Sequence, residues 1–131
     1  ICESLNYDFL IRDIINEPSF HRDNILKQFT QFTFNMHQKG ILHLDYSLGN
    51  IAITKENDDY RFHLFDINRM QFGKISPIDG IKNFSRISSD HATIKLLSSE
   101  YAKLAKIEEK KAHDILSFES KKTINYFKTI F

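Results

Sequence analysis

The chain has 131 residues, of which 41% are apolar and 27% are charged, and its formal net charge is +1. This length and composition suit one compact domain with a sizeable core and exclude a disordered tail. The near-neutral charge creates no overall positive field, so we expect no nucleic-acid partner. The single cysteine, Cys2, has no partner for an internal disulfide or a thiolate metal site, which is compatible with a reducing cytoplasm.

The sequence shows neither a membrane span nor a signal peptide. No apolar run approaches the roughly 18 residues of a span, and the first residues lack the pattern of a secretory signal. The chain begins at Ile1, and we expect it to be part of a longer protein. Lysines gather in the last third, but acidic residues alternate with them, which favours a solvated helical surface over a binding patch. These lysines are Lys103, Lys106, Lys110, Lys111, Lys121, Lys122 and Lys128.

The first half of the chain predicts one strong helix. A short helix is expected over residues 7–15, before Pro18. Apolar spacing then predicts an amphipathic helix over residues 24–39, with Asp23 or Asn24 as its cap and a glycine after its end. Its apolar face is interpreted as core packing rather than as a cofactor site. The residues of this face, at steps of four, three and four, are Ile25, Phe29, Phe32 and Met36.

A β-hairpin follows. Residues 51–54 and 60–65 have the composition of short strands, and the polar residues between them predict the turn. If Thr54 pairs near Arg61, antiparallel register keeps the sum of paired residue numbers near 115 or 116.

That register has a chemical consequence at the open end of the hairpin. It places Asn50 opposite Asp66 or one step from it. Opposed residues in an antiparallel pair have Cβ atoms about 4.5–5.5 Å apart, so an amide oxygen and a carboxylate are expected to reach one cation.

The second half predicts mainly helices. Pro77 lies at or just before the start of a short helix predicted through Phe84 and Ile87, and Ser89 or Asp90 caps the next one. One or two further helical segments are expected over residues 108–126. The apolar residues that indicate the capped helix are Ile94, Leu97, Tyr101 and Leu104.

The residues that suggest chemistry lie around the hairpin. His43, Asp45 and Asn50 have the H-x-D-x-x-x-x-N spacing of a kinase catalytic loop, and Asp66 follows the second strand, where kinases carry a metal-holding aspartate. Phosphoryl transfer needs an oriented acceptor hydroxyl and magnesium on the phosphates. Asp45 is therefore the predicted base, while Asn50 and Asp66 are the predicted oxygen ligands of magnesium.

Two neighbouring residues receive weaker roles. His43 is expected to support the loop through backbone hydrogen bonds rather than to act as a base, because Asp45 is better placed. Ser47 is a candidate contact for a nucleotide phosphate, with a loop-local hydrogen bond as the alternative. Aspartate, asparagine, serine and glycine are also frequent in ordinary loops. The combination of both motif halves across one short hairpin favours the phosphotransferase interpretation.

These motifs resemble the lipopolysaccharide kinase family, whose members phosphorylate core sugars such as 3-deoxy-manno-octulosonic acid or heptose. The resemblance lies in residues 36–50 (MHQKGILHLDYSLGN), residues 65–70 (FDINRM) and residues 83–86 (NFSR). It implies a mainly α chain with a short β-hairpin, in which residues 1–131 form the carboxy-terminal lobe of a protein-kinase-like fold. It also implies ATP and Mg²⁺ as cofactors and places Ala52 near the floor of the adenine pocket.

The chain departs from kinase patterns in two ways. Leu44 replaces the arginine of the protein-kinase loop, so activation-loop control is not implied. No segment resembles the amino-terminal nucleotide lobe, with its phosphate-covering loop and its paired lysine and glutamate. We therefore expect the isolated fragment to bind nucleotide weakly and to turn over little.

The leading functional prediction is ATP-dependent phosphorylation of a lipopolysaccharide core sugar. The expected partners are ATP, a sugar or glycolipid acceptor and the missing lobe of the same protein, in the cytoplasm, with possible peripheral contact at the inner membrane face. Two alternatives stay open. One is a non-catalytic kinase-like binding or scaffold module, and the other is a phosphotransferase that acts on a protein or small-molecule hydroxyl.

Overall fold

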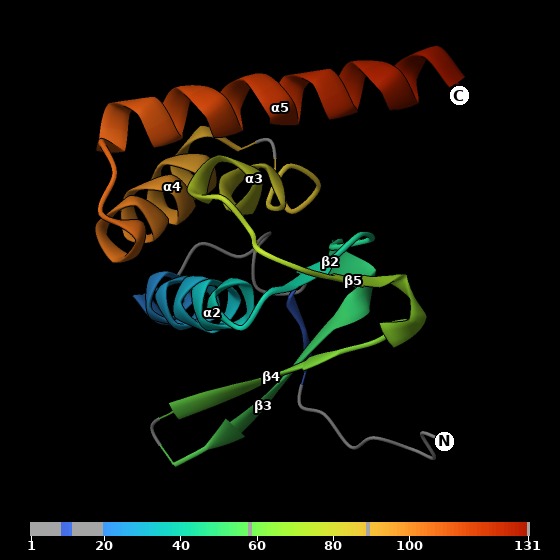
Figure 1. The fold of residues 1–131 in the computed structure, drawn as a ribbon. Helices are drawn as coiled ribbons and strands as arrows, with labels where there is room; N and C mark the ends of the chain where they lie inside the picture. Colours follow the sequence, from blue (N-terminus) through green and yellow to red (C-terminus); the bar gives the residue numbers. More distant parts are fainter. Residues whose placement is uncertain (1–8, 12–19, 58, 89, 131) are drawn as a thin grey trace.

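The computed structural model describes residues 9–11, 20–57, 59–88 and 90–130. Helices form the bulk of these residues and two small antiparallel sheets lie on one side of them (Figure 1), so the predicted mainly α chain with a β-hairpin is confirmed. The helices are α2 (Phe20–Gln38), α3 (Pro77–Lys82), α4 (His91–Ala105) and α5 (Glu109–Ile130). The strands are β1 (Phe9–Leu10), β2 (Ile41–His43), β3 (Ile51–Glu56), β4 (Asp59–Leu64) and β5 (Met70–Phe72).

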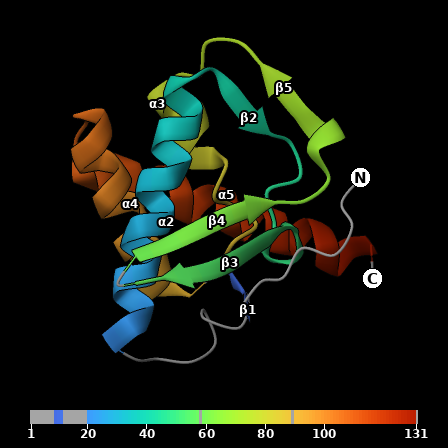
Figure 2. The ribbon, with the colours of Figure 1, turned by 90° about the horizontal axis from the view of Figure 1, so that it is seen from below.

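The predicted hairpin and its register are both confirmed. Strands β3 and β4 pair antiparallel with Thr54 opposite Arg61 and Ile51 opposite Leu64. Beyond the last of these pairs, the backbone N–H of Phe65 donates to the carbonyl of Asn50 at 2.9 Å. The hairpin thus delivers its open end to the loop that follows β2 (Figure 2).

The short helix predicted over residues 7–15 is wrong at its start. Phe9 and Leu10 form the strand β1, which pairs antiparallel with Ile53 and Ala52 of β3. β4 occupies one edge of β3, and residues 9–10 pair with the other edge. The backbone hydrogen bonds of this pairing favour a strand over the helix that the local apolar pattern predicts. Ile11 is helical and fully buried, and residues 12–19 lie outside the described residues.

The long helix α2 is correctly predicted, but its start is wrong. It begins at Phe20, so Asp23 and Asn24 lie inside its first turns and cap nothing. Its end at Gln38 is followed by Gly40, whose φ of +78° is left-handed. A Cβ atom there would lie 2.8 Å from the carbonyl oxygen of Gly73, so this sharp turn into β2 requires glycine.

The carboxy-terminal helices begin where the caps predict them, but α3 ends at Lys82, so its predicted continuation through Phe84 and Ile87 is wrong and these residues form turns. Pro77 is the first residue of α3, and the side chain of Ser76 accepts a hydrogen bond from the N–H of Asp79. Asp90 caps α4 by accepting from the N–H of Thr93 at 3.0 Å. The predicted segments after α4 form one helix, α5, which packs on α3 and α4 (Figure 1).

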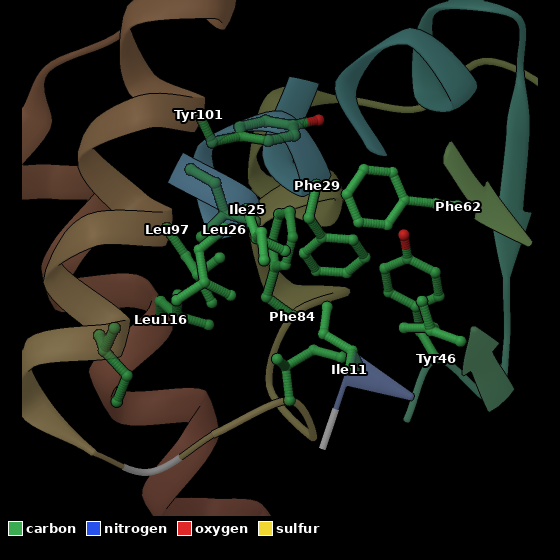
Figure 3. Packing of buried hydrophobic residues seen from close by; sticks show 14 of the residues in the cluster. Ile11, Ile25, Leu26, Phe29, Tyr46, Phe62, Phe84, Leu97, Tyr101 and Leu116 are labelled. Carbon is green, nitrogen blue, oxygen red and sulfur yellow. The ribbon is translucent and has the colours of Figure 1, made fainter. Parts of the chain in front are cut away.

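One aromatic-rich core joins the sheet to the helices (Figure 3). Phe29 of α2 lies at its centre, with ring contacts to Tyr46, Phe62 and Phe84 at centroid distances of 5.5–5.9 Å. Such aromatic pairs add about 0.5–1.5 kcal/mol each beyond the area that they bury. The predicted apolar face of α2 is therefore a core face. Within the described residues, no helix has the length and apolar character needed to cross a bilayer.

Candidate functional site

The loop that carries the motif lies between the two sheets. It leaves β2, which pairs antiparallel with β5, and it enters β3 through a single 3₁₀ turn, η1 (Leu48–Asn50). The N–H of Leu44 donates to the carbonyl of Arg69 at 2.8 Å, which extends the β2–β5 pairing past the end of β2. Both ends of the loop are thus fixed by strands (Figure 2).

His43 joins the two halves of the motif. It is fully buried. Its Nδ1 accepts the backbone N–H of Asp45 at 3.0 Å, and its Nε2 lies 2.9 Å from the carbonyl oxygen of Phe65. Because Nδ1 is an acceptor, the neutral ring carries its proton on Nε2 and donates it to Phe65. One imidazole therefore fixes the loop next to the residue that precedes Asp66.

The carboxylate of Asp45 is oriented by two side chains. The guanidinium of Arg86 lies 2.5 Å from Oδ1, and Nδ2 of Asn50 donates to Oδ2 at 3.2 Å and to the Asp45 carbonyl at 2.9 Å. The Asp45 side chain is 28% exposed. The Asp45 carboxylate is therefore accessible to an acceptor hydroxyl, while Arg86 and Asn50 fix its orientation.

Asp66 has an unusual backbone and an unused side chain. Its φ of 59° and ψ of 51° place it in the left-handed region, which costs a non-glycine residue about 1–2 kcal/mol. It precedes the 3₁₀ turn η2 (Ile67–Arg69) but makes no side-chain cap. Its side chain is exposed and has no hydrogen-bond or ionic partner within the described residues. Strained residues of this kind concentrate at functional sites.

The predicted magnesium ligands fit a hard cation in their chemistry. Asn50 donates through Nδ2 to Asp45, so its Oδ1 is left to accept, and Asp66 supplies a carboxylate. The backbone bond between Asn50 and Phe65 brings the two chain segments together. Among the described residues, no three His, Cys, Asp or Glu side chains form a metal-binding group. A magnesium ion held by Asn50 and Asp66 would need substrate phosphates and water as its other ligands.

The two predicted nucleotide contacts differ in accessibility. Ser47 is half-buried at the start of η1, and its carbonyl accepts from the N–H of Asn50 at 3.0 Å. Ala52 is fully buried in the central strand β3, where it pairs with Leu10 and His63. Its place at an adenine pocket stays a prediction.

Tyr46 anchors the loop, a role that the sequence analysis did not assign. Its side chain is 2% exposed and stacks on Phe29. Thr33 donates its hydroxyl proton to the Phe29 carbonyl at 2.9 Å, so at 2.6 Å the Tyr46 hydroxyl donates to Thr33. Burial raises the pKa of Tyr46, which keeps this donor protonated.

A buried chain of hydrogen bonds supports the loop from behind. The Tyr101 hydroxyl bonds Nδ1 of His37 at 2.7 Å, Nε2 of His37 bonds Oδ1 of Asn83 at 2.9 Å, and Nδ2 of Asn83 donates to the His43 carbonyl at 3.0 Å. The amide oxygen only accepts, so His37 donates from Nε2 and accepts from Tyr101. Burial lowers the pKa of His37, although the Asn83 bond opposes this, and raises the pKa of Tyr101. The uncharged His37 ring, with its proton on Nε2, can therefore make both of these hydrogen bonds.

The sequence alone assigned no role to Asn83 or Arg86, which entered only through the family resemblance. They contact His43 and Asp45 across separations of 40 and 41 residues. Such contacts leave no periodic signal in the sequence. His37 also received no functional role from the sequence and is packed in the core at 3% exposure.

No protein-family model and no curated protein matches the chain. Functional assignment therefore depends on the geometry of this loop and on the motif residues.

Proposed function

We propose that the chain is the carboxy-terminal lobe of a kinase-like phosphotransferase that transfers phosphate from ATP to a hydroxyl of a lipopolysaccharide core sugar. The observation that carries the proposal is the double hydrogen bond of His43, which couples the backbone of Asp45 to the residue before Asp66. Two motifs that are separate in the sequence meet at one imidazole, as a shared active site requires.

In this proposal Asp45 orients the acceptor hydroxyl and accepts its proton. Asn50 and Arg86 each hold one carboxylate oxygen, so the side chain enters the reaction with its geometry set in advance. Asp66 and Oδ1 of Asn50 hold magnesium, which neutralises charge on the transferred phosphate when it is bound. Ser47 and Ala52 are the proposed nucleotide contacts.

The proposed setting is the cytoplasm, with the glycolipid acceptor presented at the inner face of the membrane. The chain by itself is proposed to bind Mg²⁺-ATP weakly and to turn over little, because phosphoryl transfer depends on phosphate-covering elements that its motifs do not include.

The test measures phosphate transfer from labelled ATP to a lipid A precursor that bears 3-deoxy-manno-octulosonic acid, with the protein at its natural length. Asp45→Asn is expected to lower kcat by about 10²–10⁴-fold, in the range of a lost general base. Asp66→Asn should also lower kcat, because it removes a proposed magnesium ligand. Asp114→Asn, an exposed aspartate on α5, is the matched control and should leave kcat unchanged. Circular dichroism checks that each variant is folded.

The metal site is tested on the chain alone. Mn²⁺ replaces Mg²⁺ as a paramagnetic probe, and NMR signals of Asn50 and Asp66 should broaden at low Mn²⁺ concentration. Asp66→Asn should abolish this broadening and Asp114→Asn should not. Broadening centred elsewhere would contradict the proposed ligands.

One observation favours a second candidate, a non-catalytic kinase-like scaffold. The proposed base is already engaged by Arg86 in an ion pair. If the folded protein at its natural length transfers no phosphate to sugar, protein or small-molecule hydroxyls, the scaffold becomes the better account. Unchanged turnover in Asp45→Asn would instead refute Asp45 as the base.

A further inference from the structure

A cleft of about 910 Å³ lies between α2 and β4, at the turn end of the hairpin and away from the motif loop. Its volume is within the roughly 300–1,000 Å³ typical of ligand sites. One wall comes from α2 and the other from β4. The lining residues on β4 are Asp59, Tyr60, Arg61, Phe62 and His63.

The cleft follows the backbone edge of β4. Successive side chains of a strand point to opposite faces, so five consecutive residues can line one cleft only along the edge. The order of the three-stranded sheet is β1-β3-β4, which leaves the second edge of β4 without a strand partner in the described part of the chain. The strand β4 contacts α2, and Figure 2 shows it crossing α2 at an angle.

Two hydrogen bonds establish which backbone groups face the cleft. The N–H of Phe65 points to β3, because it donates to Asn50. The N–H of Tyr60 points away from β3, because it donates to Oε1 of Gln28 on α2 at 3.1 Å. Alternation along the strand then directs the N–H and C=O of Phe62 outward as well. Gln28 already occupies one position that a neighbouring strand would take.

The facing wall is a row of side-chain amides. Asn24, Gln28, Gln31 and Asn35 recur at helical spacing on one side of α2 and all line the cleft. From Asn24 to Asn35 the helix rises about 16 Å. The β4 wall is about 13 Å long. Both lengths suit four or five residues of extended chain.

We propose that this cleft binds an extended peptide segment, which pairs with the free edge of β4 and receives side-chain hydrogen bonds from the amides of α2. Edge-strand recognition obtains affinity from main-chain hydrogen bonds, and the outward N–H and C=O of Phe62 supply one such donor and one such acceptor here. Arg61 already pairs with Glu56, so the remaining charge of the lining, that of Asp59, favours a peptide with a basic side chain.

An oligosaccharide suits the cleft less well. Sugar rings stack on open aromatic faces, whereas Phe62 is 9% exposed and Phe32 is engaged with it at a centroid distance of 5.5 Å. The proposal is independent of the kinase assignment, because none of its residues belongs to the motif loop.

The test selects binders from a phage-displayed library of random dodecapeptides and measures their affinity for the chain as synthetic peptides. Gln31→Arg places a long charged side chain in the cleft and should weaken binding by about tenfold or more. Gln38→Arg is the matched control, since Gln38 is also an exposed glutamine of α2 but does not line the cleft. It should bind peptide as the wild type does.

Hydrogen exchange measured by NMR provides the second readout. Bound peptide should slow exchange of the Phe62 amide specifically, since the amides of Arg61 and His63 already face β3. Equal binding by Gln31→Arg and Gln38→Arg, or unchanged exchange at Phe62, would overturn the proposal. So would a glycan array on which oligosaccharides, but no selected peptide, bind in a manner sensitive to Gln31→Arg.

Discussion

The motif loop has two sides that differ in nearly every physical respect. On the inner side, His43 and Tyr46 are buried, and their side-chain polar atoms are all hydrogen-bonded. On the outer side, the Asp45 carboxylate is 28% exposed and Asp66 is exposed, and the Asp66 carboxylate has no hydrogen-bond or ionic partner within the described residues. Buried residues therefore hold the site rigid, and exposed residues of its two loops present the carboxylates.

This division means that substitutions on the two sides should have opposite signatures. An unmade buried hydrogen bond costs about 1–3 kcal/mol, so inner-side changes should lower stability. Outer-side changes remove few contacts, so they should affect metal binding or turnover with little loss of stability. The predictions below begin with the largest expected change in stability.

His43→Ala should destabilise the protein by about 3 kcal/mol. It removes a buried ring, leaves a cavity, and deprives the Asp45 N–H and the Phe65 carbonyl of their partners. Urea unfolding measures the free energy of unfolding, with the exposed His91→Ala as the control expected to change it by less than about 0.5 kcal/mol. If His43→Ala lowers the free energy of unfolding by as little as His91→Ala does, the buried side of the loop does not stabilise the protein through these contacts.

Gly80→Ala should destabilise by about 1–3 kcal/mol. An alanine Cβ there would lie 2.7 Å from Cζ of Tyr101 and 2.9 Å from Nδ1 of His37, so it would force apart the buried hydrogen-bond chain. A decrease in stability would identify this clash, because a glycine to alanine substitution inside a helix ordinarily increases stability by about 1 kcal/mol.

Gly49→Ala is the control for this clash, since no atom lies within 4 Å of its Cβ position. Thermal unfolding compares the two variants. Adding Tyr101→Phe to Gly80→Ala should recover part of the loss by removing the clashing hydroxyl. Stabilisation by Gly80→Ala alone would show that the chain Tyr101–His37–Asn83 adapts without cost.

The pH dependence of stability should report on His37. Burial lowers its pKa in the folded protein from the ordinary value of 6.5, so the unfolded state binds the proton more readily. His37 therefore contributes its full stability above about pH 6.5, and the contribution falls as the pH drops below that value. The slope is at most about 1.4 kcal/mol per pH unit.

Urea unfolding between pH 5 and 8 measures this slope. His37→Gln removes the titrating ring, so its curve should be flatter than that of the wild type over the same window. Asp90, whose pKa is lowered mainly by its hydrogen bonds to Thr93, loses its contribution only below this window, at more acidic pH. Parallel curves for the wild type and His37→Gln would show that His37 is not the group responsible.

Local patterns in the sequence were sufficient for the hairpin but not for its surroundings. The register followed from strand alternation and a short polar turn, and the helices after Pro77 and Asp90 followed from caps that act within one turn. Strand β1 depends on an edge more than forty residues away, and the contacts of Asn83 and Arg86 also cross the chain. Such pairings are decided by packing, which a local pattern does not encode.

The smallest expected change concerns the left-handed residues. Asp66 and Lys106 both have a φ of 59°, Asp66 at the motif and Lys106 at the end of α4. Glycine adopts this conformation without steric cost, so Asp66→Gly and Lys106→Gly should each stabilise by roughly 0.5–1 kcal/mol. Only Asp66→Gly should abolish Mn²⁺ broadening at Asn50. If both variants are more stable than the wild type but only Asp66→Gly loses the Mn²⁺ broadening, the strained aspartate is retained for metal binding. Destabilisation by Asp66→Gly would show instead that its carboxylate stabilises the fold.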